Sequence, residues 1–299
     1  MNGKGDRLRE LLHDEEPLDL PGGFSPMMAK MVQEVGFDSF FMAGSHTGQY
    51  IWGLPDAGLL TMPEMVGHAR RVADGCDIPV LADADTGYGN AVNVYRTVRD
   101  YARTGVAGIT IEDQEEPKKG QHVSRCISAD EAVGKYRAAG AARDDVGSDL
   151  VIFARCDFIT AEGGDFEGAV QRCIRYVNEG GADAVWLTQI PTREQFAEAC
   201  SRIPAPVMAG YAGPRPAPTR AEKKEMGAAA ILHRALTTEV GMQATWQFLH
   251  DFKERGEDAE REWAEWAESS KWGTVRTDKL LRFNRQKVGE LEGDYLPHD

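Results

Sequence analysis

The sequence predicts an α/β fold, a (β/α)8 barrel followed by a helical extension at the C-terminus. Short apolar runs rich in β-branched residues alternate with longer amphipathic stretches over most of the 299 residues. This alternation is typical of βαβ units and of a parallel sheet. Eight such runs occur, the number that a closed barrel of this class needs, and one barrel commonly fills about 250 residues.

The eight runs are predicted to be strands. Two of them, VIFA and AVWL, are apolar at every position, as expected of strands that are covered on both faces. In chain order the predicted strands are Leu18–Gly22, Asp38–Gly44, Pro79–Asp85, Gly108–Glu112, Leu150–Arg155, Ala184–Thr188, Pro206–Gly210 and Ala229–Leu232.

The stretches between the runs are predicted to be helices, and their ends carry the usual signals. Ser128 lies three residues before Glu131, a spacing typical of a capping box, and Asp165 precedes Phe166. Gly36 follows a helical pattern, where a left-handed residue commonly ends a helix. The predicted helices are Pro26–Val35, Met62–Ala73, Ala91–Thr104, Ser128–Arg143, Phe166–Glu179, Thr192–Ser201 and Thr219–Met226.

The chain after Leu236 has a different pattern, so we expect the barrel to occupy residues 1–235 and the extension residues 236–299. One predicted helix of the extension is strongly charged, which favours a solvated helix. Its Trp263 and Trp266 favour a subunit contact instead, because aromatic residues gather in interfaces. Both interpretations stay open. The predicted helices are Val240–Glu254, Glu257–Glu268 and Lys279–Glu290.

Acidic residues outnumber basic ones, which excludes several classes of partner. The chain has 34 Lys and Arg against 48 Asp and Glu, a formal net charge of −14. Nucleic acids and anionic membrane surfaces are bound mainly through Lys and Arg, so neither is an expected partner. A small anionic substrate is still compatible with this charge, because one local arginine or a bound cation reverses the field of a pocket.

The N-terminal segment and the cysteines indicate a soluble, cytoplasmic protein. The first twenty residues lack an apolar core followed by a small-residue cleavage site, and no run approaches the roughly 20 apolar residues that span a bilayer. The five cysteines form no C-x-x-C pair, so we expect reduced thiols rather than a zinc or dithiol site.

Acidic residues follow several predicted strands, at the face where the active sites of such barrels lie. Asp83 and Asp85 end the third strand, Glu112 ends the fourth, and Asp157 follows the fifth. Carboxylates gathered at one mouth raise one another's pKa unless a cation is present. A divalent ion with oxygen ligands and retained waters, most naturally Mg²⁺, resolves this conflict. The alternative is that these acids cap helices or pair with Lys and Arg.

Four motifs at the predicted strand ends carry a resemblance to a known family. In order they are Gly53-Leu54-Pro55-Asp56, Asp83-Ala84-Asp85-Thr86-Gly87-Tyr88-Gly89, Glu112-Asp113-Gln114 and Ala154-Arg155-x-Asp157. With them the chain resembles the phosphoenolpyruvate mutase/isocitrate lyase superfamily over roughly residues 5–250. The resemblance implies a barrel whose last helix is exchanged with a neighbour, usually in a homotetramer that is a dimer of helix-swapped dimers.

The resemblance also implies a site and its chemistry. Its substrates are small 2-oxo or 2-hydroxy acids, and Mg²⁺, or Mn²⁺ in its place, stabilises an enolate as a Lewis acid. The implied metal ligands are Asp85, Asp83, Asp56 and Glu112. The implied substrate-binding residues are Gly44, Ser45, His46, Phe24, Arg155, Thr188 and Tyr211, and the implied catalytic residues are Arg155, His122, Lys118 and Glu112.

The loop after E-D-Q departs from the lyases of the superfamily. Those lyases carry K-[KR]-C-G-H, whose cysteine is the expected acid for the departing enolate, but Gly120 stands at that position here. His122 stays in register and is able to serve, since imidazole titrates near neutral pH. Two alternatives stay open: His122 only anchors the loop, or a shifted loop brings Cys126 to the site.

Other departures concern the mutases and the pocket wall. Mutases and phosphonopyruvate hydrolases carry E-D-K-x-x-x-K-x-N-S, whereas Gln114 replaces the first lysine here and neither Asn nor Ser follows Lys118. Phe24-Ser25, Thr188 and Gly210-Tyr211 replace an aromatic-Asp pair, a glutamate and an asparagine of the lyases. We therefore expect a retained metal shell and an altered recognition of the substrate's distal half.

These observations favour a Mg²⁺-dependent carbon–carbon lyase that cleaves or decarboxylates a small 2-hydroxy or 2-oxo dicarboxylate. The branch would be 2-methylisocitrate lyase-like or carboxyphosphonoenolpyruvate mutase-like, with a divergent loop. The first alternative is a phosphonomutase acting on phosphoenolpyruvate or carboxyphosphonoenolpyruvate, or a phosphonopyruvate hydrolase. The second is a carboxylate-binding protein that has lost catalysis, because the loop cysteine and the strand-six glutamate are missing.

Overall fold

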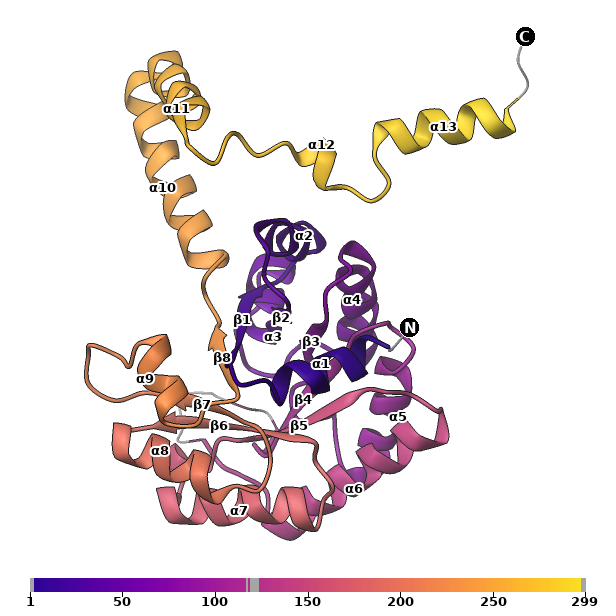
Figure 1. Ribbon diagram of the computed structural model, residues 1–299, viewed down its shortest axis with the longest axis vertical. Coiled ribbons are helices and arrows are strands. Elements are labelled where there is room, and N and C mark those ends of the chain that lie inside the picture. The colour runs from indigo at the N-terminus through magenta and orange to yellow at the C-terminus, as the bar shows by residue number, and fades with distance from the viewer. Residues whose placement is uncertain (1–2, 117, 119–123, 297–299) are drawn as a thin grey trace. The chain divides into compact units, whose positions relative to one another are not determined.

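Eight parallel strands close into one barrel in the order of the chain, which confirms the predicted fold class. The computed structural model describes residues 3–116, 118 and 124–296. Figure 1 shows the strands and the helices that alternate with them. The strands are β1 (Leu18–Gly23), β2 (Phe40–Met42), β3 (Val80–Asp83), β4 (Gly108–Glu112), β5 (Val151–Cys156), β6 (Ala184–Ile190), β7 (Val207–Tyr211) and β8 (Ala230–His233).

Seven helices lie where the helical patterns predict them. Ser128 caps α6 by accepting a hydrogen bond from the Glu131 amide, which is one half of the predicted capping box. Gly36 ends α2 in the left-handed conformation, at φ +100°. These helices are α2 (Pro26–Val35), α4 (Met62–Gly75), α5 (Ala91–Tyr101), α6 (Ala129–Asp145), α7 (Phe166–Asn178), α8 (Arg193–Arg202) and α9 (Arg220–Glu225).

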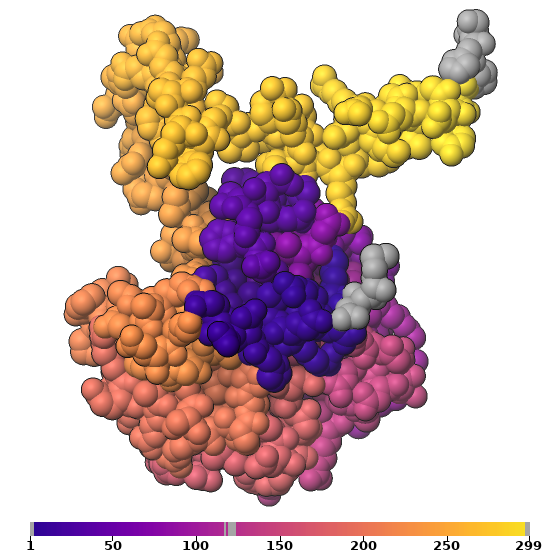
Figure 2. Space-filling model, in the orientation of Figure 1, coloured from indigo at the N-terminus to yellow at the C-terminus, as the bar shows by residue number. Residues whose placement is uncertain are grey.

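An additional helix, α1 (Lys4–Leu12), precedes the first strand and lies at the amino-terminal end of the barrel. Leu8, Leu11 and Leu12 are buried in the cluster that fills the barrel interior. The Asp149 carboxylate, just before β5, accepts hydrogen bonds from the first turn of this helix. In Figure 2 the indigo N-terminal segment forms part of the molecular surface that faces the viewer. The helix thus closes the end of the barrel opposite to the strand carboxyl ends.

The chain after β2 differs from its prediction, because the strand ends at Met42 rather than Gly44. A short helix, α3 (Gly44–Thr47), and a π-helical turn, η1 (Gly48–Trp52), follow at once. The Gly44 amide donates to the Asp83 carboxylate at 3.3 Å, so it binds a side chain of β3 instead of continuing the strand. This turn brings Ser45 and His46 to the carboxyl end of the barrel.

Contacts divide the chain into two units, Met1–Arg234 and Ala235–Asp299. In the second unit, Phe248 of α10 contacts Trp263 of α11, with ring centroids 5.4 Å apart. The last predicted helix is wrong in its bounds, because α12 ends at Leu280 and α13 begins only after Asn284, whose side chain caps it by accepting from the Lys287 amide. The helices are α10 (Thr238–Arg255), α11 (Glu257–Ser269), α12 (Thr277–Leu280) and α13 (Arg285–Tyr295).

Two further expectations concern the surroundings of the chain. Within the described residues, no helix combines the length and the apolar character that crossing a bilayer requires. All five cysteines are free thiols, and Cys76, Cys156 and Cys173 are buried. The exchange of the last helix with a neighbouring chain stays a prediction.

Candidate active site

A cavity of about 390 Å³ lies at the carboxyl ends of the strands. Seven of the predicted site residues line it, and they come from six different strands or the loops that follow them. This is the position at which barrels of this class carry their active sites. The seven residues are Ser45, Asp56, Asp83, Lys118, Arg155, Thr188 and Tyr211.

Lys118 joins three carboxylates at one side of the cavity. Its ammonium group forms an ion pair with Asp85, lies 3.3 Å from Glu112 Oε1 and lies 3.5 Å from Asp56 Oδ1. Burial opposes the charged form, but the carboxylates of Glu112 and Asp85 prevail and raise the pKa of Lys118 well above its ordinary value. The side chain therefore stays an ammonium ion, and the acids of this cluster are held together by a cation.

Burial also governs the two acids that contact Lys118 from the barrel wall. It raises the pKa of Asp85, against the opposing effect of Lys118. It raises the pKa of Glu112 to about 7, against Arg155 and Lys118. The Asp85 backbone is left-handed, with φ +48°, because the chain turns away from β3 at this residue. Asp85 and Glu112 lie behind Lys118 rather than on the cavity surface.

Asp83 fixes the relative positions of three segments around the cavity. Its carboxylate accepts hydrogen bonds from the Gly44 amide at 3.3 Å, the Thr110 hydroxyl at 3.2 Å and the Asp85 amide at 3.1 Å. These donors belong to α3, to β4 and to the turn after β3. Gly44 is needed here, because a Cβ atom would lie 2.9 Å from the Asp83 carboxylate.

Arg155 extends from β5 between two acidic residues. Its guanidinium lies 2.8 Å from Glu112 Oε2 and 2.8 Å from Asp157 Oδ2, in two ion pairs. The ring of Trp186 lies below it, with 4.3 Å between the guanidinium carbon and the ring centroid. The strand-end acids and the arginine therefore lie together at one site. In the structure these acids pair with Lys118 and Arg155, which is the alternative interpretation of the sequence.

Asp157 is held by a second row of buried groups. Its carboxylate accepts from the Thr188 hydroxyl at 2.9 Å, and its amide donates to Asp113 Oδ1 at 2.9 Å. Asp113 is buried and also accepts from the Tyr176 hydroxyl at 2.8 Å. The middle residue of the E-D-Q motif thus supports the site from behind, whereas Glu112 contacts its charged groups.

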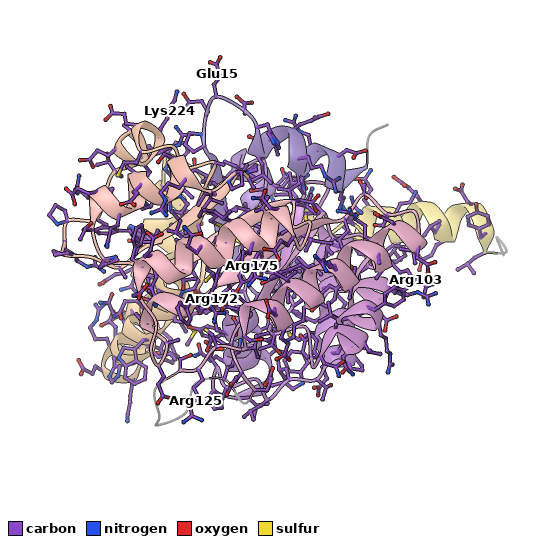
Figure 3. All side chains as sticks on the ribbon, turned by 90° about the horizontal axis from the view of Figure 1, so that it is seen from below. Glu15, Arg103, Arg125, Arg172, Arg175 and Lys224 are labelled. Atoms are coloured by element: carbon purple, nitrogen blue, oxygen red, sulfur yellow. The ribbon has the colours of Figure 1, made fainter. Side chains whose placement is uncertain are left out.

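The loop after E-D-Q is anchored at its base. Gln114 and Cys126 face each other in an isolated antiparallel bridge, and Arg172 of α7 donates to the Ile127 carbonyl at 2.9 Å. Figure 3 labels Arg172 on this helix and Arg125 on the loop. The Cys126 thiol donates to Asp113, its pKa is raised by burial, and it does not line the cavity. Cys126 is therefore poorly placed as an acid, while Gly120 and His122 lie outside the described residues.

Phe24, Gly44 and His46 lie beside the cavity wall rather than on it. The Phe24 ring stacks on Tyr50 with centroids 4.8 Å apart, and His46 packs edge-on against the same ring. All three residues were predicted to contact the substrate, but none of them lies on the cavity surface. His46 has a different contact there, since its Nε2 atom lies 3.3 Å from Arg234.

Asp157, Trp186 and Arg234 also line the cavity and are absent from the predicted site. The sequence could have indicated Asp157 as a site residue, because it lies two residues after Arg155. Trp186 is two residues from Thr188, so the alternation of a strand places both on one face. Arg234 follows β8 directly, where the strand-end rule also applies.

The donor set fits a hard divalent cation. Glu112 is buried, and neither of its carboxylate oxygens has a hydrogen-bond donor in the described part of the chain, although both belong to ion pairs. Within those residues, no three His, Cys, Asp or Glu side chains converge closely enough to form a metal centre by themselves. Mg²⁺ is compatible with such a site, because it commonly uses one or two carboxylates and keeps several waters.

The fold and the site define an α/β barrel with a charged cavity at the carboxyl ends of its strands. A family model described as phosphoenolpyruvate phosphomutase matches residues 8–252, and the chain belongs to this family, within the phosphoenolpyruvate mutase/isocitrate lyase superfamily. The resemblance stated from the four motifs is therefore confirmed.

Individual relatives include lyases and a hydrolase. 2,3-Dimethylmalate lyase of Eubacterium barkeri is 39% identical over 225 residues, which are 74% of this chain and 76% of the relative. 2-Methylisocitrate lyase of Aeropyrum pernix is 35% identical over 254 residues, 83% of this chain and 80% of the relative. A crystal structure of phosphonopyruvate hydrolase in complex with oxalate and Mg²⁺ aligns with a TM-score of 0.81 at 26% identity, covering 99% of this chain and all of that one (100%).

Proposed function

We propose that the protein is a Mg²⁺-dependent carbon–carbon lyase, which cleaves or decarboxylates a small 2-hydroxy or 2-oxo dicarboxylate. The observation that carries this proposal is the pairing of Arg155 with the acidic cluster around Lys118 at one small cavity. The similarity to lyases that are 39% and 35% identical supports the choice of a lyase over the other reactions of the superfamily.

The proposed cation site uses Asp85, Asp83, Asp56 and Glu112, directly or through waters. All four offer carboxylate oxygens, which suit Mg²⁺ and also Mn²⁺. When bound, the divalent ion supplies Lewis-acid stabilisation of the enolate charge. Lys118 pairs with three of these acids, so we expect its ammonium group to move when the ion binds.

Arg155 is proposed to hold the substrate carboxylate next to that ion. Its planar guanidinium binds a carboxylate through two parallel hydrogen bonds. Glu112 and Asp157 fix the guanidinium in place at 2.8 Å each, and Trp186 supports its face. Ser45 lines the cavity nearby, whereas the Gly44 amide is used by Asp83 and helps to position α3.

A proton donor is needed for the departing enolate. His122 is proposed for this role, because it stays in register in the loop and imidazole is a competent acid near neutral pH. Lys118 is the second candidate, because it lines the cavity as a buried ammonium ion, but the carboxylates that raise its pKa make it the weaker acid. Replacement of His122 by Gln and of Lys118 by Met separates the two, because the donor's loss should leave substrate binding while stopping proton delivery.

The proposed reaction is tested by offering the purified protein a panel of branched malates, isocitrates and oxaloacetate in the presence of Mg²⁺. Release of pyruvate, glyoxylate or another oxo acid supports the lyase, and Asp85→Ala should abolish it with the fold intact by circular dichroism. Turnover that survives Asp85→Ala or an excess of chelator would remove the cation from the proposal.

The main alternative is phosphonomutase or phosphonopyruvate hydrolase chemistry, which the matched family and the aligned hydrolase structure favour. Interconversion of phosphoenolpyruvate and phosphonopyruvate, or phosphate release from phosphonopyruvate, would replace the lyase assignment. A protein that binds oxalate with Mg²⁺ but turns over no compound of either panel would be the carboxylate-binding protein that lacks catalysis.

We also propose that the protein is a homotetramer whose C-terminal helices are exchanged within dimers. The support is an apolar stripe on α10 formed by Met242, Trp246 and Leu249, spaced at helical intervals and 50%, 64% and 57% exposed in the single chain. Such a stripe is typical of a helix that packs against another chain.

A further inference from the structure

Arg234 is a third cationic residue of the cavity, and it differs from Lys118 and Arg155 in its ion pairs. It follows β8 directly, and its exposed side chain lines the cavity. Lys118 and Arg155 are each paired with at least two carboxylates. Within the described residues, by contrast, Arg234 forms no ion pair with an Asp or Glu side chain, and its charge is left for a ligand.

His46 holds the Arg234 guanidinium. Arg234 Nη1 lies 3.3 Å from His46 Nε2. Because a guanidinium only donates hydrogen bonds, His46 Nε2 accepts this one. His46 is 3% exposed, and its ring is packed edge-on against Tyr50 with centroids 5.8 Å apart. A buried ring that accepts through one nitrogen orients the arginine without cancelling its charge.

Two polar residues of the same wall, Tyr211 and Thr188, already use their donors within the protein. The Tyr211 hydroxyl donates to the Pro214 carbonyl at 3.0 Å, and the Thr188 hydroxyl donates to Asp157 at 2.9 Å. Both were predicted to contact the distal half of the substrate. Arg234 is better suited to that task, because its planar fork matches a carboxylate and no acid among the described residues pairs with it.

We propose that Arg234 determines specificity by binding the distal carboxylate of the substrate, the one that Arg155 does not hold. His46 is the positioning residue for this contact. A cavity of about 390 Å³ has room for a small dicarboxylate between the two arginines that line it. The inference rests on the proposed function, which assigns the first carboxylate to Arg155, and it names the residue that selects a dicarboxylate over a monocarboxylate.

The test uses two ligands of nearly equal shape that differ at the distal end, L-malate and L-2-hydroxybutyrate. Binding of each is measured by isothermal titration calorimetry in the presence of Mg²⁺. The wild type should bind L-malate at least about tenfold more tightly. Arg234→Gln should weaken L-malate binding by about ten- to a hundredfold, the range for a charge-assisted hydrogen bond, and change L-2-hydroxybutyrate binding by less than about threefold.

Two further variants separate specificity from folding. Arg234→Lys keeps the charge but not the fork, so it should retain part of the preference for L-malate. His46→Ala should reduce the ratio of the two affinities by a smaller factor than Arg234→Gln. Arg261→Gln, which alters an exposed ion pair on α11, should leave both affinities unchanged.

The proposal is overturned if the wild type fails to prefer L-malate, or if Arg234→Gln weakens both ligands equally or neither. Because binding is measured rather than turnover, a protein that cleaves no dicarboxylate still reports on Arg234. Conversely, if the protein is a lyase but Arg234→Gln does not change its affinity for L-malate, the proposed reaction stands and only the role of Arg234 is rejected.

Discussion

At the scale of single residues, the site depends on an arginine that acidic neighbours hold in place. Arg155→Lys preserves the charge but removes the second hydrogen-bonding arm, so it loses the bidentate grip on a carboxylate. Its ion pairs with Glu112 and Asp157 use different arms of the planar guanidinium, a geometry that an ammonium group does not reproduce. We expect oxalate binding in the presence of Mg²⁺ to weaken by at least about tenfold in calorimetry. An affinity within twofold of the wild type would show that Arg155 does not hold the ligand, and Arg261→Lys serves as control.

A second prediction concerns the buried support of Asp157. Tyr176→Phe removes the hydroxyl that donates to Asp113 at 2.8 Å and leaves that buried carboxylate with fewer partners. We expect the free energy of unfolding in urea to fall by about 1–3 kcal/mol at neutral pH. Burial already raises the pKa of Asp113, and the loss of a donor raises it further.

The pH dependence of this loss has a defined sign. The missing donor matters for the carboxylate and less for the protonated acid, so the Tyr176→Phe deficit should be largest at neutral pH and shrink as Asp113 is protonated in acid. Tyr295→Phe, at a tyrosine that is 79% exposed, should unfold like the wild type. A deficit that grows toward low pH would contradict the role given to Asp113.

At the scale of elements, helix α1 closes the barrel from its amino-terminal end. Leu8 is fully buried in the interior cluster with residues such as Leu20 and Phe153. Leu8→Ala should lower the free energy of unfolding by about 2–5 kcal/mol, because it leaves a cavity in a packed core. Leu59→Ala, at a leucine that is 53% exposed, is the matched control. Equal urea midpoints for the two variants would mean that α1 does not contribute to the stability of the barrel.

The elements also show what the sequence can and cannot determine. Apolar runs and helix caps predict all eight strands and the seven helices between them, because each is a local signal. Helix α1 carries a local signal as well, in Leu8, Leu11 and Leu12, but nothing near it in the sequence indicates that it covers the barrel. The strand ends predict Asp83 and Glu112, since parallel strands bring their carboxyl ends together. Arg234 could not be singled out in this way, because only the structure shows which cation of the cavity pairs with no acid in residues 3–116, 118 and 124–296.

At the scale of the whole molecule, the charge of −14 and the cavity are consistent with each other. The acids at the cavity are paired with Lys118 and Arg155, so a net acidic chain still presents Arg234 to an anion. Electrostatic attraction of a dicarboxylate is therefore confined to the mouth of the cavity, near Arg234. The remaining acidic excess lies elsewhere, much of it on exposed helices such as α11, whose first turn contains Glu257, Asp258 and Glu260.

The last prediction concerns assembly, which the stripe on α10 makes testable. Charges placed at Trp246 and Leu249 should oppose burial of this face, so the double variant Trp246→Glu, Leu249→Glu should form smaller species than the wild type. Light scattering after size exclusion measures this, with four copies of the 32.9 kDa chain expected for the wild type. Val275→Glu, at an exposed valine outside the helices, is the control. A wild type that elutes as a monomer, or a double variant that stays tetrameric, would rule out α10 as the subunit contact.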